Sequence, residues 1–338
     1  MRSIKTILTT VLLGLFLTLG CDSLTDSVSD ENITLQSKEG ITANAGHCHS
    51  TVTGLTANYL NEVPTESFDV TCDIGIFFDE DGTIDGVEIY GTVAAAKSVQ
   101  FGIYVHEASV DVKNSQIFTE ESYPHQFIPI TYRDGATGTI SDNSVEGNHR
   151  SGMVFRGSGT DVTVKGNDVI GIGPKVSGWA QNGIQFDNDA TGTVSNNLVE
   201  GHWYDVSGAA SSGLVIVGSN DITAHRNTFL NNEASIYVTP GNGNNFIHNT
   251  IEILFEESKV ATPFGVILLY GDNNGVRQSS FTSAIGDELT GVGIYLVGNN
   301  NKLIRNNFSG WLYPYLDYGD ETKIPKPFQY EDGYSISG

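Results

Sequence analysis

The amino-acid sequence predicts an all-β protein, a single-domain right-handed parallel β-helix (solenoid) of about eight to ten coils. Three observations support this class. Two short motifs recur along the chain, they recur at long intervals of 22 to 30 residues, and the composition favours turns, with 39 glycines and only 17% charged residues. Self-similarity at such periods is typical of solenoids, in which each repeat forms one coil.

The first repeated motif is a small residue followed by an apolar alternation. It reads Gly-Ile-Tyr-Val at 102–105 and returns at 152–155, 183–186, 213–216, 265–268 and 293–296. Alternation with a period of two directs Ile103 and Val105 into the interior and Tyr104 outward. Each copy is therefore expected to form one strand, and strands of successive coils should stack at about 4.8 Å.

The second motif is a column of asparagines that each follow a short strand. The column comprises Asn143, Asn167, Asn197, Asn227, Asn249 and Asn306, with Ser115 and Ser279 in equivalent places. Asparagine tolerates left-handed backbone angles and can hydrogen-bond to its neighbours, so we expect it at a turn between strands. An antiparallel sandwich or barrel is the alternative, but it would need hairpin signals every 8–12 residues or so. The crossover rule for parallel strands predicts right-handed coils.

The N-terminus is typical of an exported protein. Arg2 and Lys5 precede an apolar run, and the segment 17–21 that ends in Cys21 resembles a bacterial lipobox, although Thr18 departs from its usual pattern. We expect a lipoprotein signal peptide at 1–20 and a lipid on Cys21, which would place the protein at the bacterial membrane, in the periplasm or on the cell surface. A plain signal peptide is the alternative. An acidic tether (21–40), a cap with the first coils (41–90), the β-helix (91–309) and an aromatic tail (310–338) are expected to follow.

Cysteines and charge limit the chemistry further. Cys48 and Cys72 form the only pair left after Cys21, and an oxidising compartment favours a disulfide between them. Without Arg2 and Lys5 the chain has 15 basic and 40 acidic residues, a net charge of −25. Such a surface repels nucleic acid and anionic lipid, so contact with the membrane is expected only through the anchor. We expect a monomer.

These repeats resemble the right-handed parallel β-helix superfamily that includes pectate lyases, other polysaccharide lyases, glycoside hydrolases and epimerases. The resemblance covers about 210 residues. It implies the fold and a polysaccharide or oligosaccharide partner, but the repeat supplies only the scaffold and no lyase motif matches residue by residue.

Aligning the coils predicts an outward column at the end of the first strand. Its members are His106, Arg133, Arg156, Asp187, Val217, Thr239, Leu269 and Val297. Only the first four are ionisable. The connections that lead into the same strands are longest in these coils, and they contribute further polar and aromatic residues, namely His125, His149, Arg150, Lys175, Trp179, Gln181, His202, Trp203 and Tyr204. We therefore expect one groove on coils 100–205.

The chemistry expected of this groove is that of a uronate lyase. Arg133 and Arg156 would neutralise a carboxylate, and His149, His202 or Lys175 would accept the neighbouring proton. Asp187 completes the catalytic set, and with Asp189 it could also hold Ca²⁺. Sugar-binding roles are expected for the residues that can stack on or hydrogen-bond to a glycan, namely His106, His125, Arg150, Trp179, Gln181, Gln185, Trp203 and Tyr204.

Other interpretations stay open for each feature. A glycoside hydrolase would use two carboxylates, for which Asp187, Asp189 and Asp205 are available. A non-catalytic glycan-binding or adhesion module could use the same groove. The arginines and Asp187 could form ordinary surface ion pairs, the histidines could be turn residues, the tryptophans could cover the flank of the solenoid, and Asp187 to Asp189 could be a turn.

Overall fold

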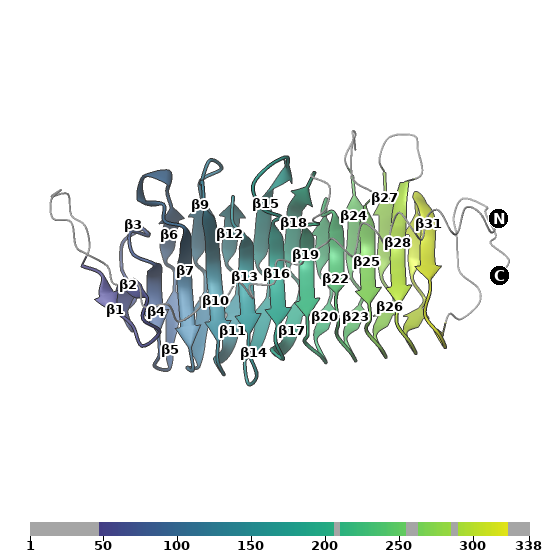
Figure 1. Ribbon diagram of the computed structural model, residues 1–338, viewed down its shortest axis with the longest axis horizontal. Helices are drawn as coiled ribbons and strands as arrows, with labels where there is room; N and C mark the ends of the chain where they lie inside the picture. Colours follow the sequence, from purple (N-terminus) through teal and green to yellow (C-terminus); the bar gives the residue numbers. More distant parts are fainter. Residues whose placement is uncertain (1–46, 206–209, 255–262, 285–289, 324–338) are drawn as a thin grey trace.

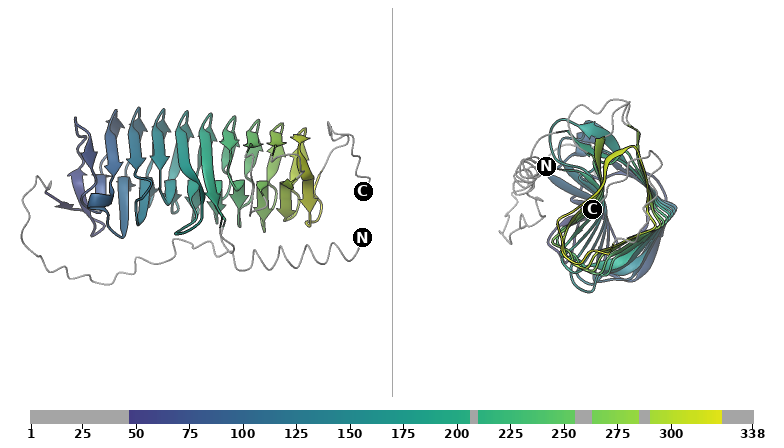
Figure 2. Two further views of the ribbon diagram at one scale, coloured as in Figure 1. Left: turned by 90° about the horizontal axis from the view of Figure 1, so that it is seen from above. Right: turned by 90° about the vertical axis from the view of Figure 1, so that its right-hand side faces the viewer.

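A computed structural model describes residues 47–205, 210–254, 263–284 and 290–323. Cys21, the expected signal peptide and tether, and the last part of the expected tail lie outside these ranges. The described chain is a solenoid built from three sheets, as Figures 1 and 2 show. The prediction of a parallel β-helix is confirmed. Nine coils are complete, because each strand of the nine-stranded sheet belongs to one coil.

The three sheets are named here A, B and C. Sheet A contains β1 (His49–Ser50), β2 (Thr56–Leu60), β4 (Ile74–Phe78), β7 (Val99–His106), β10 (Gln126–Arg133), β13 (Ser151–Arg156), β16 (Asn182–Asp187), β19 (Ser212–Val217), β22 (Ala234–Val238), β25 (Phe264–Leu269), β28 (Thr290–Val297) and β31 (Trp311–Asp317). Sheet C contains β5 (Gly82–Asp85), β8 (Val110–Lys113), β11 (Thr137–Ser141), β14 (Asp161–Lys165), β17 (Thr191–Ser195), β20 (Thr223–His225), β23 (Asn245–Ile247), β26 (Gly275–Arg277) and β29 (Lys302–Ile304).

Sheet B contains β3 (Phe68–Asp69), β6 (Glu88–Gly91), β9 (Gln116–Thr119), β12 (Ser144–Gly147), β15 (Asp168–Lys175), β18 (Leu198–Tyr204), β21 (Thr228–Leu230), β24 (Thr250–Ile253), β27 (Ser280–Ser283) and β30 (Asn307–Ser309). A short 3-10 helix, η1, spans Val93–Ala95. Each coil runs from sheet A to C to B. Among the described strands, all pairs are parallel except β1 with β2. No helix in the described ranges is long and apolar enough to cross a membrane.

The interior is a continuous apolar core. Ile103 and Val105 are fully buried in it, as the alternation predicts, and aromatic rings of neighbouring coils stack within it. The rings of Phe155 and Phe186 lie 4.8 Å apart, and those of Phe281 and Phe308 lie 4.7 Å apart. Stacked apolar side chains in every coil bury the surface that a single coil would leave exposed.

The asparagine column is a hydrogen-bonded ladder at the turn between sheets C and B. The Oδ1 of Asn197 accepts from the backbone N–H of Asn167 at 2.9 Å, and its Nδ2 donates to the carbonyl of Val164 at 3.1 Å. One detail of the expectation is wrong. The left-handed residue is the one before each ladder position, for example Asn196 with φ of 54° and Arg226 with φ of 56°. Hydrogen bonding, rather than backbone tolerance, therefore selects asparagine in the column.

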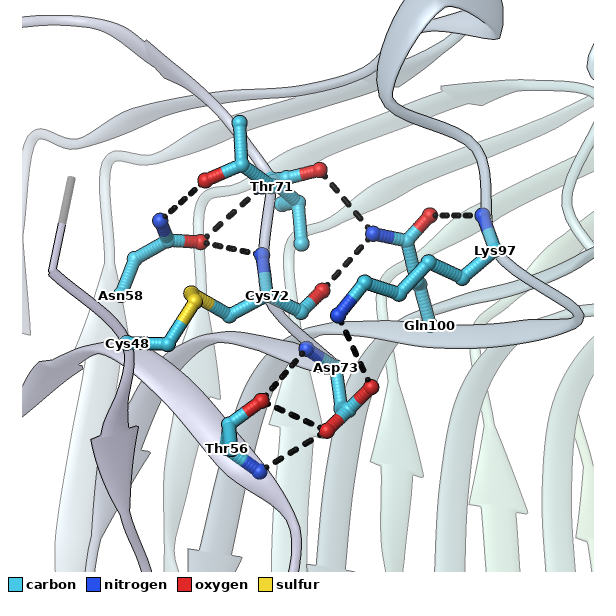
Figure 3. The surroundings of a disulfide bond; sticks show 9 residues. Cys48, Thr56, Asn58, Thr71, Cys72, Asp73, Lys97 and Gln100 are labelled. Atoms are coloured by element: carbon cyan, nitrogen blue, oxygen red, sulfur yellow. Dashed lines mark hydrogen bonds and ion pairs between the residues drawn. A yellow bond between two sulfur atoms is a disulfide. The ribbon is translucent and has the colours of Figure 1, made fainter. Parts of the chain in front are cut away.

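The N-terminal end of the solenoid is closed by covalent and polar contacts. Cys48 and Cys72 form the expected disulfide, with their Cα atoms 5.8 Å apart. Figure 3 shows its surroundings: Gln100 donates to the carbonyl of Cys72 at 2.8 Å, and Lys97 lies 3.1 Å from the carboxylate of Asp73. The disulfide and these contacts join the start of the described chain, the segment before β4 and the start of β7 to one another.

The C-terminal end continues the stack. β31 pairs in parallel with β28, and Trp311 at its start is fully buried in the core. The first residues of the expected aromatic tail are therefore one further strand of sheet A.

Candidate functional site

The outward column lies on sheet A, whose strands run side by side along the solenoid (Figure 1). Arg133 of β10 is in register with His106 of β7 and with Arg156 of β13, and Arg156 is in register with Asp187 of β16. The column continues with Val217, so the polar part ends there. This order follows from the repeat, because in-register coils bring equivalent residues to neighbouring strands.

Asp187 is the centre of the polar part of this face. Its carboxylate lies 3.4 Å from Nε of Arg156 and accepts from Nε2 of Gln185 at 2.9 Å. The Oε1 of Gln185 in turn accepts from the hydroxyl of Ser151 at 3.1 Å. Burial raises the pKa of Asp187, and the charge of Arg156 offsets only part of this rise. The carboxyl group is therefore easier to protonate than an exposed aspartate.

Arg156 has a second acceptor beside Asp187. With the amide of Asn188 oriented so that its oxygen faces the guanidinium, this oxygen accepts from Nε and Nη2 of Arg156 at 2.9 Å each. The guanidinium is thus held in one orientation on the outer face.

Arg133 is less completely paired than Arg156. Its Nη1 lies 3.5 Å from the hydroxyl of Tyr104, and its buried Nε has no hydrogen-bond partner in the described part of the chain. Burial raises the pKa of Tyr104, and the neighbouring charge of Arg133 acts against that rise. His106 on the other side of the column has its Nδ1 3.3 Å from the carboxylate of Asp134. The site therefore combines a partly paired cation with a phenol and an imidazole.

Two of the predicted bases lie inside the corner between sheets B and A. His149 and His202 are fully buried, with their Nε2 atoms 3.1 Å apart. The Nδ1 of His202 lies 3.0 Å from Oδ1 of Asn232, which is an acceptor, so this nitrogen carries the proton. Its Nε2 must then accept from Nε2–H of His149. Burial lowers the pKa of His202 to about 4 and that of His149 well below its usual value, so both rings are neutral.

The same corner also contains Lys175 and Trp179. Lys175 is 8% exposed, donates to Oδ1 of Asn148 at 2.8 Å, and lies 4.2 Å from the centre of the Trp179 ring. Burial, reinforced by the charge of Arg150, lowers the pKa of Lys175 to about 8. The Nη1 of Arg150 donates to the carbonyl of Ala180 at 2.7 Å.

The predicted single groove is therefore wrong in one respect. His149 precedes β13 and Arg156 ends it, so seven residues of extended chain separate them, a distance of roughly 20 Å. The column and the corner are two clusters at opposite ends of the same strands. His149 and His202, buried and bonded to each other, also cannot reach a sugar bound over Arg156.

The remaining predicted residues differ in their surroundings. Trp203 belongs to the core and Gln181 is fully buried, where it donates to the carbonyl of His149 at 2.9 Å, so both support the fold of the corner rather than face solvent. Tyr204 is largely buried and donates to the carbonyl of Gly178 at 3.0 Å. His125 is exposed on the connection before β10.

The predicted metal pair is not brought together. Asp187 faces Arg156, and Asp189 is exposed in the turn that follows β16. Within the described ranges no three histidine, cysteine, aspartate or glutamate side chains are grouped as metal ligands. A guanidinium therefore occupies the place beside Asp187 that a Ca²⁺ ion would need.

Tyr104, Ser151 and Asn148 also belong to these clusters, although the repeat predicts no role for them. Tyr104 and Ser151 lie on the outer face of repeat strands, and reading that whole face, instead of its last position, would have found them. Asn148 stands beside His149 in a long connection, and only the fold shows that it accepts from Lys175.

One family model and several solved structures are similar to this chain. Residues 55–205 match the family model described as a right-handed beta helix region. A search of curated proteins found no significant match. Among solved structures, the DFA-IIIase of Arthrobacter chlorophenolicus without its lid is similar, with 15% identity, a TM-score of 0.48, and 74% of this chain and 70% of that chain covered. The A-module of a mannuronan C-5 epimerase from Azotobacter vinelandii is similar with 14% identity, a TM-score of 0.36, and 75% and 78% covered.

The family match covers the first coils, and the same three-sheet stacking continues through the later coils to β31. The in-register parallel strands and the asparagine ladder, together with the family match over residues 55–205, show that the chain has the right-handed parallel β-helix fold.

Proposed function

We propose that this protein acts on a uronate-containing polysaccharide at the outer face of sheet A, as a lyase. The observation that carries the proposal is the arginine pair. Arg133 and Arg156 stand in register on strands about 4.8 Å apart, and the buried Nε of Arg133 has no partner within the described ranges. Guanidinium groups in such a position bind carboxylates through charge-assisted hydrogen bonds.

The elimination needs charge neutralisation, a base and an acid. Arg133 binds the uronate carboxylate and thereby acidifies the neighbouring C5–H. The ring of His106 accepts that proton, because His106 stands in register beside Arg133. The electron pair of the C–H bond forms the C4–C5 double bond while the C4–O bond breaks. Asp187, whose pKa is raised by burial, supplies a proton to the departing oxygen.

A non-catalytic glycan-binding module is the second candidate. The observation that favours it is the chain of hydrogen bonds from Ser151 through Gln185 to Asp187, which fixes the polar face in one arrangement. Such a face can bind an acidic sugar without turning it over.

One assay separates the two candidates. Oligouronates are incubated with the protein, the ultraviolet absorbance of the unsaturated product is followed, and binding is measured in parallel by calorimetry. Arg133→Gln should abolish both signals, whereas the control Lys113→Gln, which removes a cation paired with Asp85 on sheet C, should change neither. Binding without a rise in absorbance would favour the binding module. Unchanged turnover in Arg133→Gln would contradict the proposal.

We also propose that the protein is exported and attached to the membrane through a lipid on Cys21, and that it is a monomer. The lipobox-like segment and the acidic tether support the anchor, and the Cys48–Cys72 disulfide is consistent with an oxidising compartment. Labelling with a radioactive fatty acid should mark the protein and fail with Cys21→Ser. Equal labelling of the variant would exclude this cysteine as the attachment point.

A further inference from the structure

Lys175 is a buried cation that has no counter-ion among the described residues. Its ammonium group has three donors, and the contacts found in the described part of the chain are the neutral amide of Asn148 and the ring of Trp179. No carboxylate of the described ranges lies within 4.0 Å of it. Arg150, whose charge acts on Lys175, is also a cation. Asp205 donates its backbone N–H to the carbonyl of Lys175 at 2.7 Å, but its carboxylate forms no ion pair with the ammonium. Buried charges in proteins are normally paired, so this one is expected to receive its anion from outside.

Trp179 provides a second, independent indication of a ligand. Its side chain is partly exposed, yet its indole nitrogen is buried and has no hydrogen-bond acceptor among the described residues. A buried tryptophan N–H usually has a partner. A donor without an acceptor and an ammonium without a counter-ion therefore occur on two side chains that touch.

We infer that Lys175 and Trp179 form a second subsite, which binds the carboxylate of an acidic sugar. The ammonium pairs with the carboxylate, and the indole supplies a ring face and an N–H donor, a combination suited to a sugar acid. The chemical class of the ligand rests on the proposed function, but the anion-binding corner rests only on the local contacts.

This subsite is distinct from the arginine pair. The connection 176–181 leads into β16, and Asp187 stands at the far end of that strand, roughly 20 Å away along an extended chain. One sugar cannot contact both clusters. The two sites therefore hold different residues of one oligosaccharide, and the corner contributes to binding and positioning of the chain rather than to bond cleavage.

The fold of the corner keeps Lys175 in place. Lys175 is the last residue of β15 and is in register with Tyr204 at the end of β18, so both strands extend past their neighbours in sheet B. Asn148 is itself held, since its Nδ2 donates to the carbonyls of Glu121 and Tyr123 at 2.9 and 3.0 Å. A ligand would thus meet a preorganised ammonium, which reduces the entropy lost on binding.

The test follows the indole N–H signal of Trp179 by NMR, assigned with Trp179→Phe, while sodium galacturonate is added to the whole protein. The signal should shift in a saturable way, and Lys175→Met should weaken the apparent affinity about tenfold or more, the value of one charge-assisted contact. Lys175→Arg should retain most of the affinity. The control Lys113→Met removes an exposed cation elsewhere and should change nothing.

Four results would overturn the inference. An unmoved indole signal, or unchanged affinity in Lys175→Met, would exclude the subsite. An equal shift with galactose would show that the carboxylate is not recognised, and an equal shift with sulfate would show an unselective anion site. If Arg133→Gln loses turnover and keeps the galacturonate response at Trp179, both proposals stand. If the unsubstituted protein shows that response but no turnover, only the lyase is overturned.

Discussion

Removal of one asparagine from the middle of the ladder is expected to destabilise the solenoid strongly. In Asn197→Ala, four hydrogen bonds of the side chain disappear. Its Oδ1 no longer accepts from the N–H and Nδ2 of Asn167, at 2.9 Å each, and its Nδ2 no longer donates to Val164 and Asn227, at 3.1 and 2.9 Å. The side chain is 2% exposed, so water cannot replace these partners.

The magnitude follows from the groups left behind. The backbone N–H of Asn167 loses its acceptor, and the carbonyl of Val164 loses this donor. Nδ2 of Asn167 keeps the carbonyls of Ile140 and Lys165, and Oδ1 of Asn227 keeps the N–H of residue 197. The unsatisfied N–H of Asn167 costs about 1–3 kcal/mol and the lost hydrogen bond to Val164 about 1 kcal/mol, so the free energy of unfolding should fall by about 3 kcal/mol.

A serine variant provides the matched comparison. Ser279 occupies the same column and accepts from the N–H of Asn249 at 3.1 Å through its hydroxyl. Asn197→Ser should therefore restore an acceptor for the orphaned N–H and lose only about half as much free energy as the alanine variant. Asn220→Ala removes an exposed hydrogen bond to the N–H of Asn242 and should cost less than about 1 kcal/mol.

The assay is urea unfolding followed by circular dichroism, with all variants compared at one temperature and pH. A loss in Asn197→Ala no larger than that in Asn220→Ala would refute the reasoning, because it would mean that the ladder contributes no more than a surface contact. A serine variant less stable than the alanine variant would refute the account of the acceptor.

Further predictions concern the clusters and the N-terminal end. Galacturonate affinity at the corner should fall as the pH rises above 8, because the free ammonium of Lys175 has a pKa of about 8 and loses its charge there; a flat titration would contradict this. The neutral ring of His202 is buried, with a folded-state pKa of about 4 against 6.5 when unfolded, so its contribution to stability is complete above pH 6.5 and is lost as the pH falls towards 4. The free energy of unfolding of the protein should therefore exceed that of His202→Gln by about 3 kcal/mol less at pH 4 than at pH 6.5, measured by urea unfolding. Cys72→Ser removes the disulfide, whose cysteines are separated by 24 residues in sequence. Its free energy of unfolding should be about 3.5 kcal/mol lower than that of the disulfide-bonded protein, with the reduced protein as the control. Asp187→Asn should lower lyase turnover about a hundredfold with little change in binding, and unchanged turnover would remove Asp187 from the mechanism.

The repeat made the fold and the polar column predictable. In a solenoid, each coil pairs only with its neighbours, so a motif that recurs along the chain places its residues in register in space. For this reason Arg133, Arg156 and Asp187 could be assigned to neighbouring strands from their places in the repeat, and the structure confirms that register. The disulfide was predictable for a different reason, because only one pair of cysteines was left to form it.

The long connections were not predictable in the same way. They lie outside the repeat, so their side chains are placed by packing between coils and not by a local period. His149 and His202 looked like accessible bases, but they come from coils that are not adjacent in sequence, and the fold buries them against each other. The burial that keeps both rings neutral exists only once the intervening coil is in place.

The sequence alone determined the architecture, the order of the column and the excess of negative charge, because these depend on periodicity and composition. Tertiary structure decided that the column and the corner are two clusters, because the length of β13 and β16 separates them. It also decided that Lys175 is a buried ammonium beside Trp179 with no counter-ion in the described chain. Burial and pairing are properties of the assembled stack, since each depends on side chains that neighbouring coils contribute.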